Sequence, residues 1–340
     1  MFGRGELRVD RSFFLAALIL LGFGLLALYS AAYQKSLTSG ASYLGRQLAW
    51  VGLGVGVAVL LVVVDYHRWL QWAYPLYVAN LVLLVLVLLM GVVRVGAQRW
   101  LSIGGMTIQP SEFAKLTTIL ALSRYLGSHP ASEASFFKTA LGAAVLLLLP
   151  MGLILREPNL GTSSVFVPVG LSMLIIWGLP LQVVGILAGL AATAAPFAWW
   201  FLADYQRSRL MVFLNPSLDP LGAGYTVIQS RVAMGSGGWW GKGWLAGTQN
   251  QLNFLPERHT DFIFSVVGEE WGFFGTTACL ALFAFLFYRG FRLADQTHDP
   301  YGRLLMVGLP LPFMSYGGSW LMTCLIGVGI ILSVAARRSL

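Results

Sequence analysis

Charged residues are scarce in this chain, and their scarcity limits what kind of protein it is. Only 11% of the 340 residues are charged, whereas 57% are hydrophobic. A soluble globular domain has about 25% charged residues, so the composition excludes one and indicates an integral membrane protein. The net charge of +8 fits cationic cytoplasmic loops or an anionic ligand. We expect no nucleic-acid partner.

Cysteine and histidine are also few. Cys279 and Cys324 both lie in apolar runs, so we expect buried thiols and no disulfide framework. The four histidines are dispersed, which argues against a zinc site made by a Cys/His cluster. A loosely held divalent cation at carboxylates, Mg²⁺ or Mn²⁺, stays open. The segment 241–243 lacks the flanking residues of a Walker phosphate loop, and no Rossmann fingerprint is present.

Long apolar runs, by contrast, are abundant. A membrane-spanning helix needs about 20 predominantly apolar residues, and nine candidate spans are found. We therefore predict one all-α polytopic membrane domain over residues 1–340. The first run exceeds the roughly 7–15 residues of a signal-peptide core, so we expect it to be retained. The candidate spans are Phe13–Tyr33, Leu48–Val64, Trp72–Val93, Phe113–Leu126, Phe137–Leu155, Leu160–Gly178, Leu181–Leu202, Phe262–Arg289 and Trp320–Ala335.

The distribution of positive charge predicts that both termini are cytoplasmic, because arginines cluster at each end of the chain. Two cytoplasmic termini require an even number of crossings, but nine runs are found. A truncated apolar run, Leu304–Gly308, ends where a Pro-rich segment begins at Leu309. We therefore predict about ten helices, one of them missing from the sequence at 308/309. With that correction, eleven cytoplasmic cations compare with five in the short outer loops, which supports the orientation.

Residues 203–260 form a predicted large extracytoplasmic loop. Its 58 residues are far more than an ordinary connection has, and they carry five further cations. Residues Tyr225–Ala233 predict a short amphipathic helix lying at the interface. We interpret the Gly-rich segments 235–238 and 241–243 as flexible turns with tryptophan anchors at the headgroup level.

The most informative segment is Phe254-Leu255-Pro256-Glu257-Arg258-His259-Thr260-Asp261, which directly precedes an apolar span. A carboxylate at the mouth of a membrane helix is unfavourable unless it has a use. Asp261 is either the N-cap of the following helix or a group that performs chemistry or binds a charged ligand, and the roles are compatible. We expect the deeper Glu269 and Glu270 to pair with cations of other helices.

A second constellation is Gly96–Trp100 followed by Gln109–Lys115. Pro110 predicts the start of a helix that Ser111 can cap. Glu112 and Lys115 are three residues apart and therefore share a helix face. The pair is either a structural ion pair or a cation that faces a polar cavity.

Two further segments are unusual for membrane sequence. Arg156-Glu157-Pro158-Asn159-Leu160-Gly161-Thr162 is a tight charged connection, either a capped turn or a functional hairpin. Leu309–Gly318 contains two prolines and two glycines that interrupt helix at membrane depth. Broken backbone is tolerated there where it lines a cavity or packs as a re-entrant corner.

In this order along nearly the whole chain, these segments resemble the SEDS family (shape, elongation, division, sporulation). The stretch Gly241–Gln249 and Arg258 are similar to the elongation branch, RodA, rather than the division branch, FtsW. Family members have ten spans, with a further helix before the Pro-rich stretch, which agrees with the charge argument. Where members usually have Gln-Pro-Asp-Leu-Gly-Thr, this chain has Glu157-Pro158-Asn159, so the charge of the usual Asp is lost.

The resemblance implies a peptidoglycan glycosyltransferase that polymerises lipid II during cell-wall elongation in the bacterial inner membrane. The donor is a glycan on undecaprenyl pyrophosphate, configuration inverts, and Asp261 corresponds to the catalytic residue, acting as general base. The implied partner is a class B penicillin-binding protein. Alternatives are a lipid II flippase or transporter and a scaffold for a partner enzyme. The residues expected to bind substrate, chiefly through positive charge near the pyrophosphate, are Lys115, Glu112, Arg99, Arg207, Arg209, Lys242, Arg258, His259 and Ser315.

Overall fold

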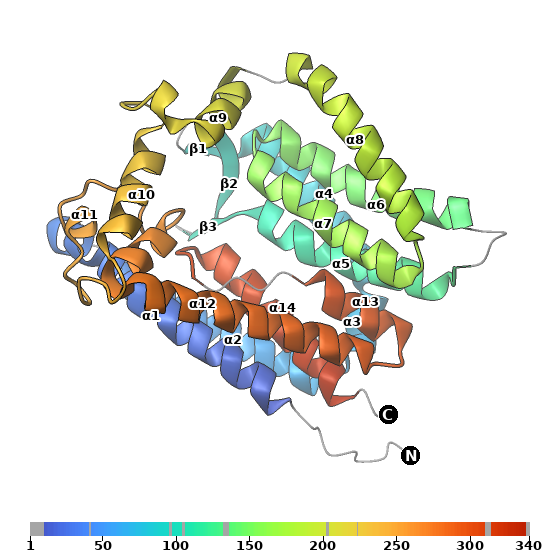
Figure 1. Ribbon diagram of the computed structural model, residues 1–340. Coiled ribbons are helices and arrows are strands. Elements are labelled where there is room, and N and C mark those ends of the chain that lie inside the picture. Colours follow the sequence, from blue (N-terminus) through green and yellow to red (C-terminus); the bar gives the residue numbers. More distant parts are fainter. Residues whose placement is uncertain are drawn as a thin grey trace.

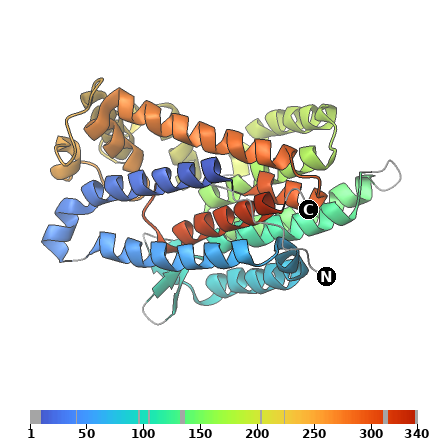
Figure 2. The same cartoon turned by 90° about the horizontal axis from the view of Figure 1, so that it is seen from below.

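The computed structural model describes residues 10–40, 42–94, 97–103, 106–131, 136–201, 204–222, 224–309 and 314–337. Within these residues, long helices run side by side, and both ends of the chain lie at the same end of the bundle (Figure 1, Figure 2). The helices are α1 Arg11–Ser39, α2 Tyr43–Val63, α3 Tyr66–Gln71, α4 Ala73–Met90, α5 Pro110–Ser128, α6 Phe136–Arg156, α7 Leu160–Trp177, α8 Leu181–Phe201, α9 Asp204–Leu214, α10 Tyr225–Ser236, α11 Thr248–Gln251, α12 Ile263–Asp295, α13 Pro300–Gly308 and α14 Gly318–Ala336, with a 3₁₀ turn at Pro216–Leu218.

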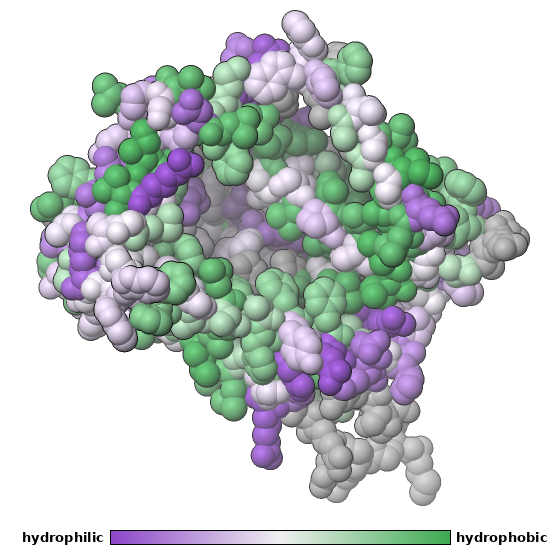
Figure 3. All heavy atoms as spheres, in the orientation of Figure 1, coloured by the Kyte–Doolittle hydropathy of each residue, from purple (hydrophilic) through white to green (hydrophobic). Residues whose placement is uncertain are grey.

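Each of the nine predicted runs coincides with a helix to within a few residues, and the polytopic membrane fold is confirmed. Seven helices in the described part of the chain, α1, α2, α4, α6, α7, α12 and α14, are long and apolar enough to cross a membrane. Charged residues interrupt α5, and α8 contains a shorter apolar stretch. Hydrophilic residues gather around α10 and α11 and around the C-terminal end of α12, with hydrophobic residues between them (Figure 3). The total of ten crossings stays a prediction.

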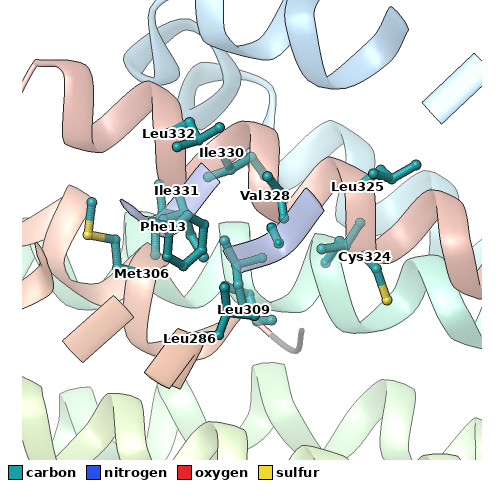
Figure 4. Close-up of a cluster of buried hydrophobic side chains, with 14 of the residues drawn as sticks. Phe13, Leu286, Met306, Leu309, Cys324, Leu325, Val328, Ile330, Ile331 and Leu332 are labelled. Carbon is teal, nitrogen blue, oxygen red and sulfur yellow. The ribbon is translucent and has the colours of Figure 1, made fainter. Parts of the chain in front are cut away.

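The core of the bundle surrounds α14. This helix packs mainly against α2, and it also contacts α5 and α13. Small residues permit the close approach: a methyl group on Gly329 of α14 would overlap the backbone of Ala58 in α2. Phe13, Leu286 and Ile331 lie in the same apolar cluster (Figure 4) and are fully buried, so α1, α12 and α14 share one core.

The chain returns from the end of α12 to the start of α14 by an unusual route. Its first part is α13, whose nine residues rise only about 14 Å, less than half of the roughly 30 Å hydrocarbon core. At its last residue, Gly308, the chain packs against Ile119 of α5 and Met173 of α7. Between α13 and α14, the described residues Leu309 and 314–317 are non-helical. In the described residues of this composite return, α13 and the residues after it, there is no further full-length helix between α12 and α14.

A small antiparallel sheet follows α4 and was not among the predicted elements. It has the order β1-β2-β3, with β1 Val92–Arg94, β2 Ala97–Ile103 and β3 Met106–Ile108. The register places Leu101 opposite Ile108. The sheet leads directly into α5 and carries Trp100 to the mouth of the bundle.

Residues 204–222 and 224–261 contain the helices α9, α10 and α11 and the 3₁₀ turn, of which the sequence predicted only one. The predicted helix at Tyr225–Ala233 is α10, which continues to Ser236. The Gly-rich segment after it docks into a break in α12 at Gly272, where φ is +63°. The backbone amides of Lys242 and Gly243 donate to the carbonyls of Glu269 and Glu270, at 3.0 Å in each case. The segment is therefore a docked loop rather than a flexible turn, because its amides satisfy carbonyls that the break leaves open.

Candidate active site

Asp261 lies in a tight turn at the entrance to α12. Its backbone amide donates to the carbonyl of Glu257 at 3.1 Å. The helix begins at Ile263, and its N-cap is Phe262, which has no side-chain capping bond. The alternative that Asp261 is the N-cap of this helix is therefore wrong, and its carboxylate is exposed.

The turn is joined to the segment that precedes α14. The backbone amide of Tyr316 donates to the carbonyl of His259 at 3.1 Å, and the Ser315 hydroxyl donates to the carbonyl of Thr260 at 3.2 Å. These bonds bring the Pro-rich segment against the Asp261 segment, 54 residues earlier in the chain, and fix one wall of a cavity.

The cavity has a volume of about 420 Å³ and contains two carboxylates, those of Asp261 and Glu112. Hydroxyl and amide groups from four segments of the chain surround them, and aromatic rings complete the wall. A space of this size and mixed character is typical of a small-molecule or sugar site. The lining residues are Trp100, Gln109, Glu112, Thr260, Asp261, Ser315, Tyr316, Gly317, Ser319 and Trp320.

Glu112 reaches the cavity from the first turn of α5. Pro110 is the first residue of that helix, as predicted, but Gln109 is its N-cap, and the buried Ser111 hydroxyl forms no hydrogen bond among the described residues. The Glu112 carboxylate accepts a bond of 2.7 Å from the Lys115 ammonium, which also lies 4.2 Å from the ring centre of Trp320. Glu112 lines the cavity and Lys115 lies behind it, so the ion-pair alternative holds and the cavity receives no uncompensated charge from the pair.

A second cavity of about 740 Å³ adjoins the first and shares Trp100, Thr260, Tyr316 and Gly317 with it. His259 lies on its wall. Burial lowers the pKa of His259, and the neighbouring Lys35 and Arg258 act in the same direction, so the ring is neutral at pH 7. The other residues that line it are Tyr43, Arg46, Ala49, Trp50, Leu53, Thr107 and Gly318.

Of the remaining predicted cations, Arg99, Arg207, Lys242 and Arg258 do not line either cavity. Arg207 donates to the carbonyls of Trp199 and Trp200. Arg258 is buried and donates to the carbonyl of Ala31 at 2.7 Å. The side chain of Arg209 lies outside the described residues.

The deeper carboxylates of α12 have different partners. Glu269 forms an ion pair of 2.8 Å with Lys242, so its predicted cationic partner is present, although it comes from the loop rather than from a helix. Glu270 instead accepts hydrogen bonds from Ser30 and Asn250, so its predicted pairing with a cation is wrong. Both groups therefore attach the loop and α1 to α12.

Arg99 connects the sheet to the α6–α7 connection, because its guanidinium donates to the carbonyls of Glu157 and Pro158. The Asn159 side chain accepts from the Thr162 amide at 3.3 Å, which confirms the capped-turn interpretation. The carboxyl of Glu157 is 1% exposed and has no hydrogen-bond partner among the described residues. Burial raises the pKa of Glu157 to about 8, against a smaller opposing effect of Arg99.

Several cavity residues escaped the sequence analysis. Trp100 belongs to the motif Gly96–Trp100, but no feature of the sequence indicated that it lines a cavity. Arg46, in the first turn of α2, counted only as a loop charge. Trp320 opens the last span and showed no signal beyond its apolar character. Among the described residues, no three His, Cys, Asp or Glu side chains are grouped to hold a metal ion.

Fold and site together define a polytopic membrane protein with a two-part polar cavity at one end of its helix bundle. The family model for FtsW, RodA and SpoVE, described as "Cell cycle protein", matches residues 10–309. The chain belongs to this family, the SEDS proteins, and most resembles its RodA branch. The match ends at the point where the sequence predicts a missing span.

Curated relatives and solved structures agree with this membership. The peptidoglycan glycosyltransferase MrdB of Escherichia coli K12 is 37% identical over 98% of this chain and 95% of its own length. That comparison extends over 360 residues against 340 in this chain, so at least 20 positions of the relative have no counterpart here. RodA of Treponema pallidum is 31% identical over 98% of the chain and 99% of its own length.

The structural neighbours have the same fold over almost the full length. A chain from a peptidoglycan synthase complex superposes with a TM-score of 0.80 and 31% identity, covering 98% of this chain and 99% of the neighbour. Thermus thermophilus RodA superposes with a TM-score of 0.70 and 30% identity, with the same coverage.

Proposed function

We propose that this protein is a peptidoglycan glycosyltransferase that polymerises lipid II during cell-wall elongation, with Asp261 as general base. The observation that carries the proposal is the exposed carboxylate of Asp261, which does not cap its helix and lines a 420 Å³ cavity at the end of the bundle. Relatives named peptidoglycan glycosyltransferase support the reaction class.

The reaction forms a glycosidic C–O bond and an Asp261 O–H bond, and it breaks the acceptor O–H bond and the C–O bond to the phosphate. The sugar 4-hydroxyl of a lipid II acceptor gives its proton to Asp261, and its oxygen attacks the anomeric carbon of the donor glycan. The bond from that carbon to the phosphate oxygen breaks, and undecaprenyl pyrophosphate leaves with the electron pair. Attack from the opposite face inverts the configuration, so no covalent enzyme intermediate is needed. Glu112, the other carboxylate on the wall, is already engaged in an ion pair of 2.7 Å with Lys115.

A divalent cation is compatible with this cavity. Mg²⁺ keeps several water ligands and needs only one or two carboxylates, and Asp261 and Glu112 are the two acids on the wall. If these residues held such an ion, it would supply positive charge to the cavity. The chain's own residues line the space for the acceptor, with Trp100 and Trp320 as aromatic parts of the wall, and Asp261 accepts the proton.

The orientation follows from the positive-inside argument: both termini are cytoplasmic, and the Asp261 cavity faces the outside of the inner membrane. A class B penicillin-binding protein is the proposed partner. The structural neighbour taken from a peptidoglycan synthase complex supports such a pairing. The flippase alternative is not favoured, because the relatives are named for glycosyl transfer.

The test is lipid II polymerisation by purified protein carrying Asp261→Asn, with Asp295→Asn as the control. Asp295 is an exposed carboxylate at the opposite end of the same helix. Removal of the general base should lower the rate by about 10²–10⁴-fold while lipid II still binds, and the control should retain full activity. Polymerisation at the wild-type rate by Asp261→Asn would remove the catalytic assignment. Transbilayer movement of lipid II without polymer formation, in wild-type protein, would favour a flippase.

A further inference from the structure

The two adjoining cavities carry charge of opposite sign. The cavity that contains Asp261 has two carboxylates and no Lys or Arg on its described wall. The 740 Å³ cavity has one arginine, Arg46, and no carboxylate on its described wall. Trp100 and Tyr316 belong to both walls, so one ligand can extend from the acidic part to the basic part.

The surroundings of Arg46 are electropositive. It lies in the first turn of α2, where the helix N-terminus contributes a partial positive charge. The Lys35 ammonium lies 5.5 Å from the ring centre of Tyr43, another wall residue. No hydrogen bond or ion pair of the Arg46 guanidinium is found in the described part of the chain, and its side chain is exposed. Arg46 therefore presents its charge to the cavity, unlike Lys115, which is paired with Glu112.

The wall next to Arg46 is apolar along the helix. Ala49, Trp50 and Leu53 follow it on α2 and line the same cavity. Leu53 is 56% exposed, so this face of α2 is open toward the membrane. A ligand that fits has an anionic head beside Arg46, a long apolar chain along α2, and a sugar between the aromatic rings.

We propose that Arg46 binds the pyrophosphate of the polyprenyl-linked donor, which makes the larger cavity the donor subsite and the Asp261 cavity the acceptor subsite. This assignment rests on the proposed glycosyltransferase function. The pyrophosphate of the donor is anionic before and after the bond to the sugar breaks, and a guanidinium can bind it by donating two parallel hydrogen bonds. The proton of the acceptor hydroxyl leaves toward Asp261 on the other side.

The first test measures binding without turnover. The probes are geranylgeranyl pyrophosphate and geranylgeraniol, which have the same chain but differ in charge, and binding to detergent-solubilised protein is followed by equilibrium dialysis. Arg46→Ala should weaken pyrophosphate binding about 10- to 100-fold and leave alcohol binding unchanged, because a charge-assisted hydrogen bond is lost. Arg46→Lys should recover part of the affinity. Arg231→Ala, which removes an exposed arginine of α10, is the matched control and should bind both probes as wild type does.

The second test separates this assignment from the proposed function. Asp261→Asn should bind the pyrophosphate as wild type does and fail to polymerise lipid II, whereas Arg46→Ala should raise the donor KM more than it lowers kcat. Wild-type pyrophosphate affinity in Arg46→Ala would overturn the donor subsite whatever the activity of Asp261→Asn. An equal loss of pyrophosphate and alcohol binding would also overturn it, because the effect would then not depend on charge. Activity retained in Asp261→Asn would refute the base without affecting the dialysis result.

Discussion

The carboxyl of Glu157 should make the protein less stable as the pH rises from about 5 to 8. Its pKa is raised by burial from an ordinary value of 4.5 to about 8, so the folded protein holds the proton more tightly than the unfolded chain does. The resulting stabilisation is complete below pH 4.5 and is lost as the pH approaches 8. One pKa unit corresponds to about 1.4 kcal/mol, which gives on the order of 3 kcal/mol lost at pH 7. This is an upper value, because a local opening of the connection lets water reach the carboxylate.

The assay is unfolding of purified protein in detergent at pH 5, 7 and 8.5. Glu157→Gln keeps the shape and removes the titration, so its stability should exceed that of wild type by roughly 2–3 kcal/mol at pH 7 and by less than about 1 kcal/mol at pH 5. Asp204→Asn, which alters a fully exposed carboxylate, should leave the pH dependence unchanged. Identical pH profiles for wild type and Glu157→Gln would refute the reasoning.

A double-mutant cycle extends this test to the departure from the family pattern. Asn159→Asp introduces a second acid two positions from Glu157, in a buried connection. The combined change Glu157→Gln, Asn159→Asp produces the usual Gln-Pro-Asp. We expect a coupling of about 1 kcal/mol or more at pH 8, because only Asn159→Asp alone leaves two acids together. Additive effects would show that the two positions are independent.

Three further predictions concern other parts of the molecule. Lys115→Ala leaves the buried Glu112 carboxylate uncompensated and should lower the unfolding free energy by about 3–5 kcal/mol. The double change Lys115→Met, Glu112→Gln removes both charges and should cost less. Equal losses in the two variants would contradict the ion-pair argument. Gly241→Ala should destabilise the protein by more than about 1 kcal/mol, because φ is +81° and a methyl group would overlap the carbonyl of Glu270; Gly235→Ala, with open space around it, is the control, and equal stability would exclude the docked loop. Chelation with EDTA should slow polymerisation and addition of Mg²⁺ should restore it if carboxylates share an ion with the pyrophosphate; unchanged rates would exclude a divalent cation.

The membrane helices could be predicted from the sequence because each one is a long apolar run, and length alone separates such runs from other elements. The sheet at 92–108 could not, because its strands are short and stand between two spans. Gly104-Gly105 between Ile103 and Met106 is a hairpin signal, but it is weak without knowledge of the partner strand. The break in α12 could not be predicted either. It depends on contacts with a loop 30 residues earlier, and the sequence around the break does not indicate them.

The site was predicted in part for a similar reason. Asp261 and Glu112 could be chosen because a carboxylate at a membrane boundary is unusual wherever its side chain points. The positions of the cationic groups could not be predicted in the same way, because a long flexible side chain can reach in several directions. Arg258 stands three residues from Asp261, yet its guanidinium donates to Ala31 of α1. Arg46 lines the larger cavity, although its sequence position indicated only topology.

The composite return of α13 and the described residues after it has a consequence for how the protein enters the membrane. Nine helical residues are too few to partition into lipid by themselves. The described residues after them, Leu309 and 314–317, are non-helical and have backbone groups that lipid cannot satisfy. Ile119, Met173, His259 and Thr260 provide the contacts that lipid does not. Residues 300–309 and 314–317 therefore pack against α5, α7 and the start of α12, and we expect this part of the chain to insert into the assembled bundle rather than directly into the bilayer.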